Sequence, residues 1–191
     1  LAQAGWFQEV SLSAYASALL YTFLNSLLWL LGIHGANLLQ PLMTHLNEMS
    51  FATGGFVNET FLGAFVFIGG SGATFSLILA ILLFSKKKAL RLLSYASIPI
   101  AFLNINELLL FGLPIILNPR TLIPFLSVPL INLLTSYMAI SFAWVAAPTP
   151  DIQMPLITLT GLNAYLATNH DLHAVLLQVV NIAIGVGIYS L

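Results

Sequence analysis

A carboxylate preceded by two amides is the most informative group of side chains in this sequence. Glu107 ends the segment Asn104-Ile105-Asn106-Glu107, which lies inside otherwise apolar sequence. An acidic side chain at the centre of a membrane helix costs about 2.5–3.5 kcal/mol, so it normally faces a cavity, a partner or a substrate. The carboxylate and the two amides together supply acceptors and donors suited to several sugar hydroxyls. We therefore favour a polyol ligand over a simple cation; the alternative is a carboxylate that only holds the fold together.

His34 is the second candidate for chemistry. It ends a long apolar run and is followed by Gly35, Ala36 and Asn37. Imidazole titrates near neutrality, so His34 is expected to form hydrogen bonds or transfer protons opposite Glu107. The glycines beside it would allow another backbone or a ligand to approach closely. The alternative is a histidine that lies at the water interface or is satisfied within a helix bundle.

A glycine-rich segment, Gly69-Gly70-Ser71-Gly72, resembles a phosphate-binding loop only superficially. It lacks the GxGxxG and GxxxxGK[ST] spacings that cradle phosphates. Small residues in a transmembrane helix usually permit close packing. We therefore predict a packing role within a membrane helix for this segment.

The composition requires a membrane environment. Of 191 residues, 59% are hydrophobic and 6% are charged, whereas soluble domains carry about 25% charged residues. The net charge of −1 excludes a basic surface for nucleic acid, and the lack of cysteine excludes disulfides, thiolate metal sites and cysteine nucleophiles. The pair His170 and His173 is a weak basis for a metal site, so we expect no metal and no cofactor.

Four charge-free runs are long enough to cross a bilayer as helices, which takes about 20 residues. They lie between Glu9 and His34, between Glu59 and Lys86, from Thr121 to Pro150 and from Leu172 to Leu191. The sequence thus predicts an all-α integral membrane protein that crosses the membrane several times. Residues 86–91 contain four of the five basic side chains, so the positive-inside rule places this loop in the cytoplasm.

Between these runs, the region from Arg91 to Arg120 has a different pattern. Two shorter apolar stretches, residues 92–106 and 108–119, flank Glu107, and the second contains Gly112, Pro114 and Pro119. Interrupted helices at membrane depth are tolerated where they are buried in protein or line a cavity. We predict a re-entrant hairpin here. Residues 35–59 are a second such hairpin or an extramembrane loop, and the prolines within residues 148–169 argue against one continuous helix.

Several of these motifs occur together in one family. Residues 102–119, FLNINELLLFGLPIILNP, resemble the signature of enzyme IIC permeases of the lactose, cellobiose and chitobiose type in the phosphotransferase system. The segments GIHGAN (residues 32–37) and FIGGSGAT (residues 67–74) resemble the same family in the right order. The similarity continues through YLAT (residues 165–168) and VLLQVVN (residues 175–181).

The resemblance implies a permease of the bacterial inner membrane that is a homodimer at full length. Residues 1–191 would form a single membrane-embedded domain, the C-terminal sugar-binding part, with one or two re-entrant hairpins and without most of the dimer-forming half. His34 and Glu107 would contact a di- or oligosaccharide, supported by Asn104, Asn106 and Asn37. A phosphocysteine on the partner enzyme IIB, itself supplied through enzyme IIA, would phosphorylate a sugar hydroxyl, and Glu107 would serve as general base.

The sequence departs from the family pattern in two places. Leu108 replaces the proline that usually follows the NINE motif, and Leu156-Ile157-Thr158-Leu159 replaces a Trp-Thr-Thr-Pro sequence. The second departure removes an aromatic face for sugar stacking. We therefore keep two hypotheses for the function: a sugar-transport domain, and a sugar-sensing input domain of a membrane signalling protein. Because the chain opens at Leu1, we also expect it to be a segment of a longer protein.

Overall fold

The structure, a computed structural model, describes residues 2–113, 115–116, 118–149 and 158–190, and for residues 2–12 and 120 it describes the backbone alone. All regular elements in these residues are helices, which confirms the all-α prediction. They are α1 (Ala2–Leu30), α2 (Gly35–Leu38), α3 (Gln40–Thr53), α4 (Glu59–Phe61), the π-helix η1 (Leu62–Val66), α5 (Thr74–Phe84), α6 (Lys88–Ala101), α7 (Glu107–Gly112), α8 (Pro119–Ser141), α9 (Leu162–Ala167) and α10 (Leu172–Tyr189).

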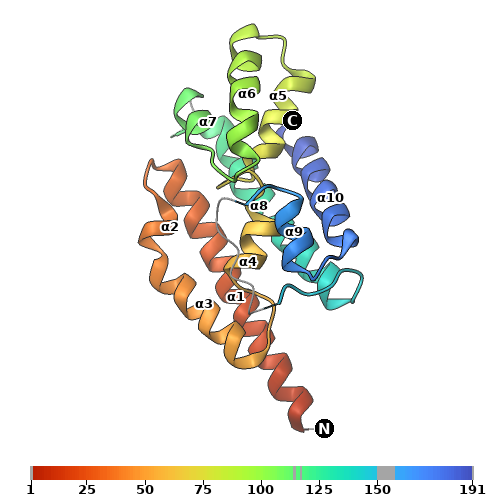
Figure 1. Ribbon diagram of the computed structural model, residues 1–191. Coiled ribbons are helices and arrows are strands. Elements are labelled where there is room, and N and C mark those ends of the chain that lie inside the picture. The colour runs from red at the N-terminus through yellow and green to blue at the C-terminus, as the bar shows by residue number, and fades with distance from the viewer. Residues whose placement is uncertain (1, 114, 117, 150–157, 191) are drawn as a thin grey trace.

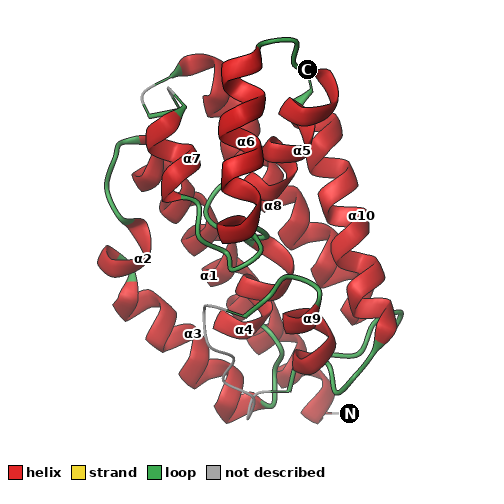
Figure 2. Cartoon of the chain, turned by 45° about the horizontal axis from the view of Figure 1, so that its top comes forward, coloured by secondary structure: helices red, strands yellow, loops and turns green. Residues whose placement is uncertain are grey.

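Long helices form the frame of the molecule. Helix α1 packs against α3 and α8, and α10 packs against α5 and α8. The start of α1 and the end of α10 lie at opposite ends of the molecule, with the α5–α6 pair near the latter (Figures 1 and 2). The short helices pack against their neighbours: α2 against α1, α4 against η1, α7 against α6 and α9 against α10.

Three of the four predicted crossings contain a long helix. The first run corresponds to α1, the third contains α8 and the fourth contains α10. Within the described residues, Thr121–Ser141 and Leu172–Tyr189 are long and apolar enough to cross a membrane by length and composition. Helix α8 continues through Pro124 and Pro129 and ends at Ser141, so the turns that follow it are not part of a crossing helix.

The prediction of one helix between Glu59 and Lys86 was wrong. Helix α4 passes directly into η1, which ends at Val66, and α5 begins only at Thr74. The residues between them, 67–73, form a turn that we call the glycine turn. Gly69, Gly70 and Gly72 have positive φ there. This conformation is strained for residues that carry a Cβ atom, whereas glycine adopts it readily. The glycine-rich segment thus interrupts the helix, although it does pack closely, as predicted.

Ending a helix leaves its last carbonyl groups without partners in the helix. At this break, the carbonyls of four consecutive residues, 63 to 66, each accept a hydrogen bond from a side-chain amide. The donors are Asn104 for Gly63 (3.3 Å), Gln178 for Ala64, Asn181 for Phe65 (3.0 Å) and Asn132 for Val66 (3.2 Å). Gln178, Asn181 and Asn132 are at most 1% exposed. Side chains from α8, α10 and the loop before α7 therefore replace the missing helical bonds.

Two apolar cores lie on either side of the break. One contains Phe61, Phe65 and Val66 with residues of α1, α3, α8 and α10. The other contains Ile68 and Phe75 with residues of α5, α6 and α7. The glycine turn lies between them, so the interruption falls where the two cores meet.

The region predicted as a hairpin around Glu107 contains two helices. Helix α6 ends at Ala101, a loop follows, and α7 begins at Glu107 and packs against α6. Residues 35–59 contain the helices α2 and α3. Residues 148–169, which the prolines predict not to form one continuous helix, contain the short helix α9. Residues 150–157 lie outside the described residues, among them Leu156 and Ile157 of the segment that replaces Trp-Thr-Thr-Pro.

Replacing one of the four amides tests whether they support the break. Gln178→Leu keeps a similar volume but removes the bond to Ala64 and those to Asn163 and Gly161. We expect the free energy of unfolding to fall by about 1–3 kcal/mol for each polar group left without a partner. Unfolding titrations in detergent would measure this loss. The matched change Gln40→Leu, at an exposed position of α3, should have little effect, and equal stability of the two variants would contradict the prediction.

A second substitution pair tests the packing of the glycine turn. Gly72 and Gly54 both have positive φ, so alanine is strained at either site. A Cβ at Gly72 would clash with the ring of Phe125, whereas a Cβ at Gly54 meets nothing within 4 Å. We expect Gly72→Ala to lower the melting temperature further than Gly54→Ala, by an overpacking cost of about 1–3 kcal/mol. Equal melting temperatures would show that the turn is loosely packed.

Candidate functional site

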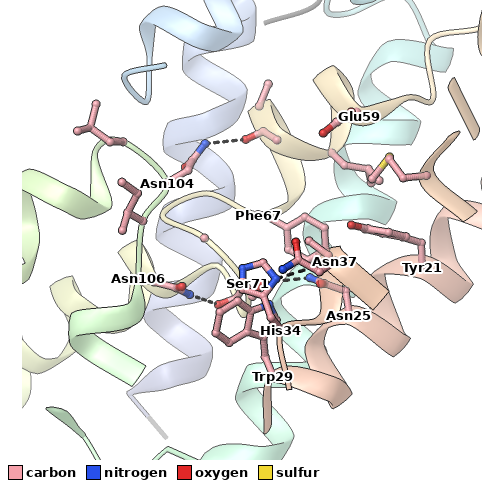
Figure 3. Close-up of a pocket in the computed structure, with 18 of the residues that line it drawn as sticks. Tyr21, Asn25, Trp29, His34, Asn37, Glu59, Phe67, Ser71, Asn104 and Asn106 are labelled. Carbon is pink, nitrogen blue, oxygen red and sulfur yellow. Dashed lines mark hydrogen bonds between the residues drawn. The ribbon is translucent and has the colours of Figure 1, made fainter. Parts of the chain in front are cut away.

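A pocket of about 320 Å³ opens beside the glycine turn. This volume falls within the range of small-molecule sites, roughly 300–1,000 Å³. In Figure 3 the labelled polar side chains converge on it from several separate segments. The lining residues that carry polar or aromatic side chains are Tyr21, Asn25, Trp29, His34, Asn37, Gln40, Glu59, Thr60, Phe67, Ser71, Asn104, Asn106, Glu107 and Asn163.

The structure brings all the predicted site residues to this one pocket. His34 precedes α2, and Asn37 lies within it. Asn104 and Asn106 lie in the loop before α7, and Glu107 is the first residue of α7. Two segments about 70 residues apart in sequence therefore meet at the same cavity.

His34 has a defined orientation. Its Nδ1 accepts a hydrogen bond from the backbone N–H of Asn37 (3.4 Å), which caps α2. Since Nδ1 is the acceptor, the neutral ring carries its proton on Nε2. The ring lies against Trp29, with centroids 4.6 Å apart. His34 thus has an Nε2–H that can donate a hydrogen bond, and its ring is held against an aromatic surface.

Asn104 and Asn106 fix the glycine turn as well as lining the pocket. Asn104, which has φ +59, accepts from the N–H of Gly69 through Oδ1 (2.8 Å) and donates to Gly63. Asn106 is 4% exposed and donates through Nδ2 to the carbonyl of Ser71 (2.7 Å). Their amides are therefore bonded to the backbone, which suits the supporting role that the resemblance implies.

Glu107 retains capacity for a ligand. One carboxylate oxygen accepts a hydrogen bond from the backbone N–H of Asn106 (3.1 Å). An ionised carboxylate has about four acceptor positions, so this bond leaves the group able to accept from several hydroxyls. The side chain is half-buried in the pocket wall.

A second carboxylate in the pocket, Glu59, was not predicted. Its side chain accepts from Nδ2 of Asn47 (3.3 Å), and its backbone N–H donates to Oδ1 of the same asparagine (2.9 Å). Sequence reasoning used Glu59 only as the end of a charge-free run. The pair of polar residues Asn58-Glu59 before an apolar stretch was the available signal, because Asn58 caps α4.

Asn25 was also missed, because it is a single amide inside the first apolar run. It is 3% exposed and donates to the hydroxyl of Ser71 (3.0 Å). Its Oδ1 is buried and has no hydrogen-bond partner among the described residues. Asn25 thus joins α1 to the glycine turn at the pocket wall, where it adds a polar group.

The pocket has the chemistry of a site for a neutral, hydroxyl-rich molecule. Glu59 and Glu107 are hydrogen-bond acceptors, His34 is a donor, and Trp29 and Tyr21 provide aromatic surface. Because the chain contains no cysteine, a thiol nucleophile is not available within it. The side chains present can bind a polyol and remove a proton from one of its hydroxyls.

Comparisons with known proteins agree with this chemistry. Residues 2–129 match the family model described as "Phosphotransferase system, EIIC". The lichenan permease IIC component of Bacillus subtilis is 33% identical over 174 residues, covering 85% of this chain and 38% of the relative. The cellobiose-specific EIIC component of Lactococcus lactis is 31% identical, covering 93% of this chain and 42% of the relative.

A solved structure matches the fold over almost the whole chain. The crystal structure of ChbC, the IIC component of an N,N'-diacetylchitobiose-specific phosphotransferase system, aligns with a TM-score of 0.83 and 33% identity. The alignment covers 96% of this chain and 45% of that one. The chain thus spans about two fifths of the length of the relatives it matches. It belongs to the EIIC family of the phosphotransferase system, within the lactose, cellobiose and chitobiose group that its motifs indicated.

Proposed function

We propose that this chain is the sugar-binding part of a phosphotransferase-system permease that takes up a di- or oligosaccharide. The observation that carries the proposal is the pocket lined by Glu107, His34 and the two asparagines, Asn104 and Asn106, that bond to the glycine turn. The family match supports it, as do the names of the relatives. Nothing in these comparisons supports the alternative of a sugar-sensing signalling domain.

In this proposal the pocket holds a sugar hydroxyl where enzyme IIB can reach it. The phosphorus–sulfur bond of the phosphocysteine on IIB breaks as a phosphorus–oxygen bond to the hydroxyl forms. Glu107 accepts the proton that the hydroxyl loses, and His34 donates a hydrogen bond to the sugar through Nε2. Asn104 and Asn106 hold the surrounding backbone in place. Catalysis by this chain is thus mainly positioning and proton removal.

The same proposal extends to the membrane. We place the chain as one domain in the bacterial cell membrane, with the loop that carries Lys86, Lys87 and Lys88 in the cytoplasm. The segments α2–α3 and α6–α7 are proposed as re-entrant hairpins, because each contributes polar residues to the pocket. The full-length protein is proposed to be a homodimer that presents its bound sugar to IIB, which transfers to that sugar the phosphoryl group it received through IIA.

Glu107→Gln tests the proton-removing role. In vesicles that carry the full-length permease and its phosphotransfer partners, we expect disaccharide phosphorylation to fall by roughly 10²–10⁴, the usual contribution of a general base. Binding of the unreacted sugar should weaken less. Glu48→Gln is the matched control, because Glu48 is exposed on α3 and does not line the pocket. Uptake at the wild-type rate in the Glu107 variant would contradict the assignment.

His34→Phe tests the hydrogen bond from the imidazole. The new ring retains an aromatic contact with Trp29 but loses the Nε2 donor, so sugar affinity should fall roughly tenfold. Equilibrium binding to the full-length permease would measure the change. His45→Phe, at an exposed position of α3 outside the pocket, should bind as the wild type does. If both variants bind equally, His34 does not contact the sugar.

A further inference from the structure

We infer that the pocket excludes phosphorylated sugars by charge, so that the permease rejects its own product. The inference rests on the proposed function, because it concerns the same site and the sugar that would be phosphorylated there. It assigns a role to Glu59, which phosphoryl transfer does not use. The substrate class that follows is neutral oligosaccharides, with sugar phosphates and other anionic sugars excluded.

The charges around the pocket have one sign. Glu59 and Glu107 both line it, and neither lysine nor arginine occurs among its described lining residues. The chain has only five basic side chains, and four of them lie in residues 86–91. Arg91 is bonded there to the carbonyl of Leu82 (2.7 Å) at the end of α5. A phosphate in the pocket would therefore face carboxylates without a matching cation from this segment.

The position of Glu59 is fixed rather than free. Asn47 of α3 accepts from its backbone N–H and donates to its carboxylate. Asn58, which is 6% exposed, caps the same short helix through the N–H of Phe61 (2.9 Å). With both its backbone and its side chain held, Glu59 keeps its charge in the wall of the pocket instead of moving away from an approaching anion.

Two backbone donors of the glycine turn are already bonded within the protein and are not available to a phosphate. A turn of this kind often binds phosphate through exposed N–H groups. Here the N–H of Gly69 donates to Asn104 (2.8 Å), and the N–H of Gly70 donates to the carbonyl of Phe67 (2.8 Å). Two of the turn's donors are thus already used, which agrees with the absence of phosphate-loop spacing in its sequence.

Phosphorylation changes the charge of the ligand. A neutral sugar has hydroxyl donors that both carboxylates can accept, whereas a phosphate monoester carries about −1.5 to −2 charges at pH 7. In a half-buried site, repulsion between such charges is much stronger than in water. The product would be destabilised as soon as it forms, which favours its release and prevents cytoplasmic sugar phosphate from occupying the site.

Calorimetric titration of the full-length permease tests the inference. The probes are cellobiose, cellobiose 6′-phosphate and 6′-O-methylcellobiose, of which the methyl ether adds bulk without charge. We expect the phosphate to bind roughly 100-fold more weakly than cellobiose, and the methyl ether to bind within about tenfold of it. In the Glu59→Gln variant, the ratio of the affinity for cellobiose to the affinity for its phosphate should shrink roughly tenfold.

A control variant separates the charge of Glu59 from a general loss of negative charge. Glu48→Gln removes the same charge at an exposed position of α3, so it should leave the ratio unchanged. If Glu59→Gln does not fold, Glu107→Gln removes the other pocket charge and should also shrink the ratio. If cellobiose and its phosphate bind with equal affinity, or if the methyl ether binds as weakly as the phosphate, the inference is overturned while the proposed function stands. If none of the sugars binds, both are overturned.

Discussion

Four backbone carbonyls at the end of η1 impose the main constraint on this structure. In an apolar surrounding, a buried carbonyl without a partner costs about 1–3 kcal/mol. The chain solves this with amide side chains from Asn104, Gln178, Asn181 and Asn132. Three of these donors come from long helices, so the break is held by the helical frame itself. A helix interrupted without those donors would be unstable in this environment.

The same break creates the pocket. Because the helix stops at Val66, the glycine turn brings Gly70 and Ser71 to the cavity, where Asn25 and Asn106 bond to Ser71. The bond from Asn106 in turn fixes the start of α7, and therefore the position of Glu107. Stability and binding thus depend on one set of polar contacts. The glycine segment and the segment around Glu107 both lie within residues 2–129, which match the family model.

Much of the site could be predicted from the sequence, but the interrupted helix could not. Glu107 and His34 were apparent because polar residues in apolar runs need a reason to be there, and both line one pocket. The run from Glu59 was predicted as one helix because hydropathy reports burial and not continuity. Isolated amides such as Gln178 and Asn181 are the sequence feature that relates to the break, since each requires a hydrogen-bond partner inside the bundle. Their partners lie more than 100 residues away in sequence, so the pairing is decided by packing that local patterns do not contain.

The most direct test is an experimental structure of the full-length permease with a bound disaccharide. We predict that sugar hydroxyls lie within hydrogen-bond distance, about 2.6–3.2 Å, of the Glu107 carboxylate and of Nε2 of His34. We also predict that the hydrogen bonds from amide side chains to the carbonyls of residues 63–66 remain in place around the interrupted helix. A sugar bound away from this pocket, or a continuous helix through residues 67–73, would contradict these predictions.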